Sequence, residues 1–87
     1  MSLLDNIQNY YESLVLEALA DSPGASKMDA DTQTDIICIA LNHLPPRYIR
    51  HEVDMVYYTS PMEREELAQK AHKAVEDALN YVIKNDR

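Results

Sequence analysis

Hydrophobic side chains near the beginning of the chain recur at intervals of three and four residues, which is the spacing of one face of a helix. The residues on this stripe are Leu4, Ile7, Tyr11, Leu14 and Ala18. Polar residues and helix breakers follow at Asp21-Ser22-Pro23-Gly24. The pattern therefore predicts a first helix from about Leu3 to Ala20 and a polar loop over residues 21–31.

A second helix is predicted between this loop and a pair of prolines. Asp29 or Asp31 can cap its first turn, because either carboxylate can accept hydrogen bonds from the exposed backbone N–H groups there. The stretch Ile36–Leu44 is apolar apart from two polar residues near its end, so we expect this helix to be buried on most sides, with Cys38 as a small buried hydrophobe. Pro45-Pro46 ends the helix, because the residue before a proline is disfavoured in the helical conformation.

The segment that follows the prolines has a different pattern. Two sets of residues alternate in it, one of them entirely hydrophobic, and β-branched and aromatic side chains dominate. The alternating residues are Val53, Met55 and Tyr57 on one side and Asp54, Val56 and Tyr58 on the other. This pattern favours a short strand or an extended arm at about residues 52–59. A strand needs a partner, and the same segment in a second copy of the chain could supply it.

The last helix has the strongest sequence features. Ser60, Pro61 and Glu63 are the capping serine, first-turn proline and third-position glutamate of a capping box. Small apolar residues then recur at helical spacing, which allows another helix to approach closely. These residues are Ala68, Ala71, Val75, Ala78 and Val82.

The chain has 87 residues, of which 46% are hydrophobic and 26% are charged, as in a single folded domain. Its one glycine argues against glycine-rich phosphate loops, and its one cysteine excludes an internal disulfide or a cysteine zinc cluster. The longest apolar run is far shorter than the ~20 residues of a membrane span, and no basic stretch typical of a secretory signal is present. We therefore predict a mostly α-helical, cytoplasmic domain over 1–87 with three main helices.

The charge of the chain is uneven. The formal net charge is −7, which argues against long nucleic acids and anionic membranes as partners. Residues 1–46 contain only one cation against seven acids. Between Ile36 and His51, however, there is no acid, and His43, Arg47 and Arg50 lie in that interval. A small anion could be held there even though a long polyanion would be repelled.

Catalytic and metal motifs are weak in this sequence. His72 and Glu76 have the spacing of two metal ligands on a helix, but the sequence places no further ligand beside them. The acidic group formed by Glu63, Glu65 and Glu66 fits a helix N-terminus better than a catalytic pair. No nucleophile motif or phosphate-binding loop is present. We expect no catalytic residues, no metal and no other cofactor.

The segment around the two prolines is a rigid elbow between a helix end and two arginines. A guanidinium can grip a phosphate or a guanine edge with two hydrogen bonds, and Asn42 offers a donor and an acceptor on one amide. The candidate ligand-binding residues are Asn42, Pro45, Pro46, Arg47, Tyr48, Arg50 and His51. An alternative is a purely structural turn whose arginines cap helix carbonyls. Tyr48, Tyr57 and Tyr58 could likewise stack on a base or simply pack.

The stretch Asp35–Tyr48, with its Ala-Leu-Asn-His-Leu-Pro-Pro core, resembles the signature of the late competence development protein ComFB family. Asn9-Tyr10-Tyr11-Glu12 with Val15 resembles the first helix of that family, and the likeness covers about residues 5–83. The resemblance implies a small, helical, dimeric bacterial protein without catalytic activity, from a family linked to recognition of cyclic dinucleotides. The cysteines that hold zinc in some members are not matched here.

These expectations lead to one preferred function and one alternative. The preferred function is a homodimeric, non-enzymatic receptor for a cyclic dinucleotide, with cyclic di-GMP favoured, because a two-fold ligand suits a two-fold dimer. The alternative is an interaction module that binds a protein partner of a competence, motility or biofilm pathway without any ligand.

Overall fold

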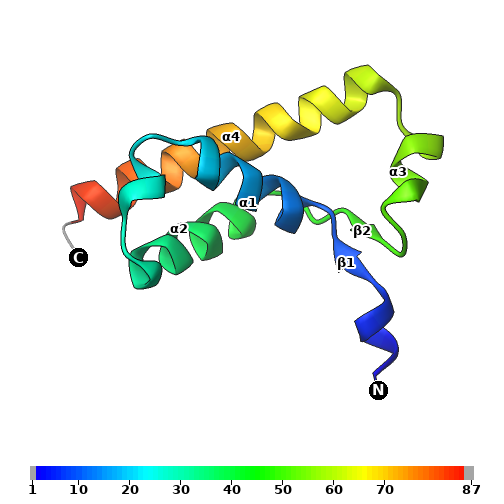
Figure 1. Ribbon diagram of the computed structural model, residues 1–87, viewed down its shortest axis with the longest axis horizontal. Helices are drawn as coiled ribbons and strands as arrows, with labels where there is room; N and C mark the ends of the chain where they lie inside the picture. The colour runs from blue at the N-terminus through cyan, green and yellow to red at the C-terminus, as the bar shows by residue number, and fades with distance from the viewer. Residues whose placement is uncertain (1, 86–87) are drawn as a thin grey trace.

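Three helices pack side by side and form the core of the molecule (Figure 1). They are α1 (Tyr11–Asp21), α2 (Ala30–Asn42) and α4 (Pro61–Lys84). The remaining elements are a short helix α3 (Val53–Tyr58), strands β1 (Gln8–Asn9) and β2 (Tyr48–Ile49), and 3-10 turns at Leu3–Asn6 and Ala25–Lys27. This computed structural model describes residues 2–85. The predicted mostly helical fold is confirmed, with four α-helices in the described part of the chain rather than three main ones.

The core lies between α1, α2 and the C-terminal half of α4. Tyr11, Val15, Ile36 and Val75 are the largest fully buried side chains. The contribution of α4 is mostly alanine and valine, so α1 and α2 can approach its backbone closely, as the sequence predicted. The core residues on α4 are Ala71, Ala74, Val75, Ala78, Leu79 and Val82.

The N-terminus of α4 has the predicted capping box. The Ser60 hydroxyl accepts a hydrogen bond from the Glu63 backbone N–H at 3.1 Å, and the Glu63 carboxylate accepts one from the Ser60 N–H at 3.2 Å. Pro61 occupies the first helical position, where no N–H is needed. Local sequence alone therefore explains where this helix begins.

Helix α2 begins after Asp29, which settles the choice between the two candidate caps. The Asp29 carboxylate accepts a hydrogen bond from the Thr32 N–H at 2.8 Å. The expectation that α2 is buried on most sides is wrong, because only Ile36 and Ala40 within it are fully buried. Cys38 is exposed rather than buried. The reason is that α1 and α4 both pack against the same side of α2, which leaves its other side without a covering element.

The prediction of a first helix from Leu3 is also wrong. The chain forms a 3-10 turn and β1 before α1 starts at Tyr11. The Asn9 side chain accepts a hydrogen bond from the Tyr11 N–H at 3.2 Å, which favours a helix start at this point. Leu3 and Leu4 continue the apolar spacing, but they are 88% and 71% exposed because the N-terminal arm extends away from the core.

A strand or extended arm at about residues 52–59 is not observed, since residues Val53–Tyr58 form α3. The alternating pattern did not predict this helix correctly, because a strand with one buried face would bury Val53, Met55 and Tyr57, whereas only Met55 is buried here. The strand of this region is β2, and it pairs antiparallel with β1, with Gln8 opposite Ile49 and Asn9 opposite Tyr48. The partner strand therefore comes from the same chain.

The molecule is flat, with principal extents of 41 × 35 × 19 Å. The β1–β2 ribbon, α3 and the N-terminal arm occupy one end, away from the packed part of α1 and α2 (Figure 1). Within residues 2–85, no helix is long and apolar enough to cross a membrane.

Candidate ligand-binding site at the α2 elbow

The elbow is the segment that leads from the end of α2 into β2. Leu44 is buried in the core and anchors it, whereas Pro45 and Pro46 are exposed. The His43 and Leu44 backbone N–H groups donate to the carbonyls of Ala40 and Leu41 at 3.1 and 3.3 Å, which closes the end of the helix. The elbow is thus fixed at its start by packing and hydrogen bonds.

Its other end is fixed by Asn9, which the sequence did not single out as a site residue. The Asn9 side-chain oxygen accepts a hydrogen bond from the Arg47 N–H at 2.9 Å. The Tyr10 N–H donates to the Arg47 carbonyl at 2.7 Å. The backbone of Arg47 is therefore held on both sides, which makes Asn9 a positioning residue for the arginine. A polar residue directly before two aromatic residues was the sequence feature that could have indicated this role.

Three of the predicted site residues lie together in a hollow of about 270 Å³, which we call the arginine hollow. Its lining residues are Arg47, Tyr48, Ile49, Arg50, Asp54, Met55 and Tyr58. Ile49 and Met55 are buried, whereas Tyr48 and Tyr58 are largely exposed aromatic side chains. The hollow is thus lined by two buried apolar residues, two arginines, two exposed tyrosines and one acidic residue, Asp54.

Neither arginine side chain in the hollow forms an ion pair or a hydrogen bond with another of the described residues. The alternative in which Arg47 and Arg50 cap helix carbonyls is therefore not observed. Arg64 takes such a role instead, because its Nη1 atom donates to the Thr59 carbonyl at 2.9 Å and to the Met55 carbonyl at 3.3 Å, at the end of α3. The guanidinium groups of the hollow remain available to a ligand.

The charge of Arg47 also acts on the core. Burial raises the pKa of the Tyr11 phenol above its ordinary value, and the nearby positive charge of Arg47 partly offsets this increase. Tyr11 therefore stays neutral at physiological pH.

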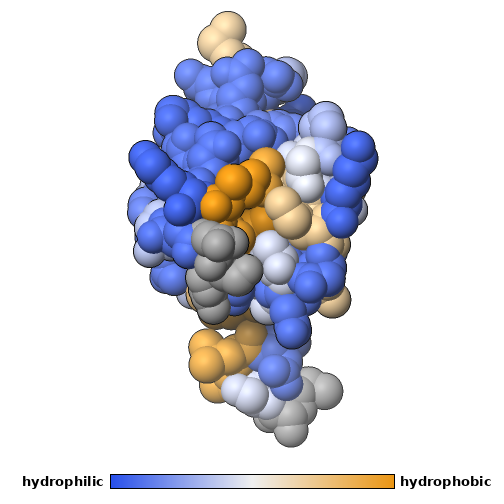
Figure 2. Space-filling view, turned by 90° about the vertical axis from the view of Figure 1, so that its left-hand side faces the viewer, coloured by the Kyte–Doolittle hydropathy of each residue, from blue (hydrophilic) through white to orange (hydrophobic). Residues whose placement is uncertain are grey.

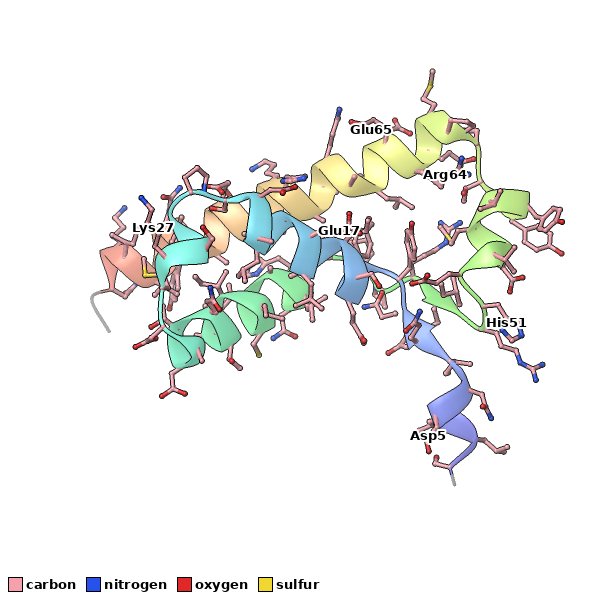
Figure 3. All side chains as sticks on the ribbon, in the orientation of Figure 1. Asp5, Glu17, Lys27, His51, Arg64 and Glu65 are labelled. Atoms are coloured by element: carbon pink, nitrogen blue, oxygen red, sulfur yellow. The ribbon has the colours of Figure 1, made fainter. Side chains whose placement is uncertain are left out.

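Asn42 and His43 lie in a different hollow, which we call the α2–α4 groove. It has a volume of about 450 Å³ and is lined by Ile39, Asn42, His43, Ala74, Asp77, Ala78 and Tyr81. The structure therefore divides the predicted site residues between two hollows joined by the elbow. Pro45, Pro46 and His51 line neither of them, and Figure 3 shows His51 at the bend between β2 and α3.

A third hollow, of about 380 Å³, lies between α1, α3 and the start of α4. Figure 3 shows two of its lining residues, Glu17 and Arg64, on facing elements. The arginine is already engaged with the end of α3, and the remaining charges, Glu17 and Glu52, are acidic. Within residues 2–85, this hollow therefore has no cation that is free of other contacts and could hold an anionic ligand.

The two-residue metal motif does not develop into a metal centre within the described range. His72 Nε2 lies 4.0 Å from Asp21 Oδ2, and no group of three or more histidine, cysteine or acidic residues is brought together in residues 2–85.

Comparison with known proteins gives one clear match. The family model described as "Late competence development protein ComFB" matches residues 8–86. This range includes the elbow, the arginine hollow and the α2–α4 groove. No curated protein and no solved structure matches the chain.

Proposed function

Because the chain belongs to the family of late competence development proteins ComFB, we propose that it is a non-enzymatic, cytoplasmic receptor for a cyclic dinucleotide, with cyclic di-GMP as the preferred ligand. The observation that carries this proposal is the arginine hollow. Arg47 and Arg50 line it beside two exposed tyrosines and Asp54, and neither arginine forms an ion pair within residues 2–85, in a chain whose net charge is −7.

The chemistry of the hollow matches a small nucleotide better than a long one. Arg47 and Arg50 can each bind a phosphate through paired N–H donors, and Tyr48 can stack on a base. The acidic surface elsewhere repels a long polyanion. Pro45 and Pro46 restrict the elbow before binding, which reduces the entropy lost when a ligand is held.

Self-association is part of the proposal. The N-terminal arm and α3 expose large hydrophobic side chains, and the arm is seen as a hydrophobic patch at the bottom of Figure 2. These side chains are Leu3, Leu4, Ile7, Val53, Val56, Tyr57 and Tyr58. At roughly 100 Å² of exposed area each on average, these seven side chains together would approach the ~800 Å² per partner of a standard interface. Because α3 also lines the arginine hollow, a two-fold contact there would bring two such hollows together, which suits a two-fold symmetric ligand.

Isothermal titration calorimetry of the purified protein with cyclic di-GMP, and separately with cyclic di-AMP, tests the function. We expect saturable binding of cyclic di-GMP and weaker binding of cyclic di-AMP. Absence of heat and of a thermal shift with both nucleotides would overturn the proposal, because a ligand that binds only the native state must raise the melting temperature.

A second candidate function is a ligand-independent interaction module. The exposed side chains of Val53, Val56 and Tyr57 on α3 favour it, since a protein partner could cover them. Recovery of one defined protein partner, equally with and without cyclic di-GMP and lost in Val56→Asp, would support this function over the receptor.

A further inference from the structure

The α2–α4 groove has the size of a ligand site. Its volume of about 450 Å³ lies within the roughly 300–1,000 Å³ of small-molecule sites. Ala74 and Ala78 end at Cβ and leave room between the two helices, and Ile39 forms an apolar wall. Tyr81, about half exposed, adds an aromatic ring at one end.

The polar groups of the groove are mostly hydrogen-bond acceptors. The His43 Nδ1 atom lies 2.8 Å from the Ile39 carbonyl, which can only accept, so Nδ1 carries the hydrogen and Nε2 of the neutral ring is an acceptor. The Asn42 amide nitrogen lies 3.7 Å from the Cys38 sulfur, which leaves its side-chain oxygen free to accept. Asp77 adds a carboxylate, and one of its oxygens, Oδ2, pairs with Lys73 at 2.9 Å.

The acceptor groups and apolar walls of the groove determine which chemical group of a ligand can bind there. Among residues 2–85, no lysine or arginine lines the groove, whereas the Asp77 carboxylate does, and Lys73 comes near it only through its ion pair with Asp77, so a phosphate is disfavoured there. A planar heterocycle that carries N–H donors is favoured, because it can lie between the apolar walls, stack on Tyr81 and donate to Asp77.

We propose that the α2–α4 groove is a guanine-binding subsite in which Asp77 accepts from the base and Tyr81 stacks on it. Guanine presents two donors side by side, N1–H and the N2 amino group, and a carboxylate can accept both, with Oδ2 of Asp77 shared between the base and Lys73. Adenine presents an unprotonated N1 acceptor at the corresponding position, which would face the negative charge of Asp77. This inference rests on the proposed function, because the guanine would be part of the same cyclic dinucleotide whose phosphates bind in the arginine hollow.

Nucleosides without phosphate test the groove separately from the arginines. We propose to titrate isotope-labelled protein with guanosine, inosine and adenosine and to follow backbone amide signals by NMR. Guanosine should shift the signals of Asn42, Asp77 and Tyr81 and leave Arg50 unchanged. Inosine, which lacks the N2 amino group, should bind several-fold more weakly, and adenosine more weakly still. Equal affinity for guanosine and adenosine, or shifts confined to other surfaces, would overturn the inference.

Matched variants identify the residues responsible. Asp77→Asn removes the charge of the acceptor and should weaken guanosine binding about tenfold. Lys73→Met breaks the same ion pair without lining the groove, so it should leave binding within about twofold, which is less than the loss of one hydrogen bond. Tyr81→Phe should retain binding and Tyr81→Ala should lose it. If Lys73→Met weakens binding as much as Asp77→Asn, the carboxylate acts through the ion pair and the assignment is wrong.

The two proposals fail in different ways. If cyclic di-GMP binding requires Arg47 but is insensitive to Asp77→Asn and Tyr81→Ala, the receptor function holds and the groove is not its base subsite. If guanosine binds in the groove but cyclic di-GMP binds no more tightly, the guanine site holds and the cyclic dinucleotide receptor is wrong.

Discussion

The side-chain oxygen of Asn9 accepts a hydrogen bond from the backbone N–H of Arg47 at 2.9 Å, across 38 residues of sequence. This hydrogen bond connects β1, which precedes α1, to the end of the elbow, and so fixes the position of the Arg47 backbone. Arg47 contributes to the arginine hollow with its side chain while its backbone is held by the β1 region. The position of the candidate ligand-binding arginine is therefore a product of tertiary structure.

Asn9→Ala should destabilise the protein and weaken ligand binding together. The substitution leaves the N–H groups of Tyr11 and Arg47 without their acceptor, and such a loss costs about 1–2 kcal/mol of unfolding free energy. Urea unfolding followed by circular dichroism measures it. Asn9→Asp retains an acceptor oxygen and serves as the control. Equal stability of the alanine variant and the wild type would show that this hydrogen bond does not hold the elbow.

Ser60→Ala should destabilise α4 at its N-terminus. Removal of the capping hydroxyl leaves the Glu63 N–H without its partner, and the expected loss is about 0.5–2 kcal/mol. Thermal unfolding is the measurement. Glu65→Gln, one turn away and outside the capping box (Figure 3), should have little effect. A Ser60→Ala protein as stable as the Glu65→Gln protein would contradict the capping assignment.

Acid should weaken the start of α2 through Asp29. Hydrogen bonds from Thr32, chiefly from its side chain and then its backbone N–H, lower the pKa of the Asp29 carboxyl below its ordinary value of 3.8. A lowered pKa in the folded state means that the ionised carboxyl contributes stability above pH 3.8 and that this contribution is lost as the pH falls through the folded-state pKa. The difference in unfolding free energy between wild type and Asp29→Asn should therefore change with pH below that point. A constant difference would refute the assignment.

The proposed homodimer should depend on the end of the molecule that carries the arm and α3. Val56→Asp and Leu4→Asp place charges on exposed apolar side chains, so the monomer should still fold while the dimer dissociates. Light scattering after size-exclusion chromatography reports the mass. Ile83→Asp is the matched control, because Ile83 is 56% exposed and Val56 is 62% exposed, but Ile83 lies at the opposite end of α4. A wild-type protein that is monomeric at all concentrations would rule out this interface.

Features encoded by neighbouring residues could be predicted from the sequence. The capping box at Ser60, a cap at Asp29 or Asp31 and a helix end just before Pro45 all depend on a few adjacent side chains, and the structure selects Asp29 and ends α2 at Asn42. The spacing of the alanines on α4 also predicted a core-facing stripe, because helical periodicity is itself local.

Features that depend on what packs against a segment could not be predicted in the same way. Cys38 is exposed because α1 and α4 cover only the other side of α2. Leu4 continues the apolar spacing of α1 but contacts no core residue. The alternating pattern of residues 53–58 resembled that of a strand, but these residues form α3, in which Met55 is the single buried residue. For the site, the sequence identified the elbow and its arginines, but neither Asn9 nor the division of the site residues between two hollows.

Titration calorimetry of Arg47→Ala and Arg50→Ala with cyclic di-GMP tests the central claim most directly, with Lys70→Ala, an exposed cation on α4 outside the arginine hollow, as the control. Each hollow variant should bind at least about tenfold more weakly than the wild type, because a charge-assisted hydrogen bond contributes about 1.5–3 kcal/mol. The Lys70→Ala protein should bind as the wild type does. Unchanged affinity in both hollow variants, or an equal loss in Lys70→Ala, would contradict the account.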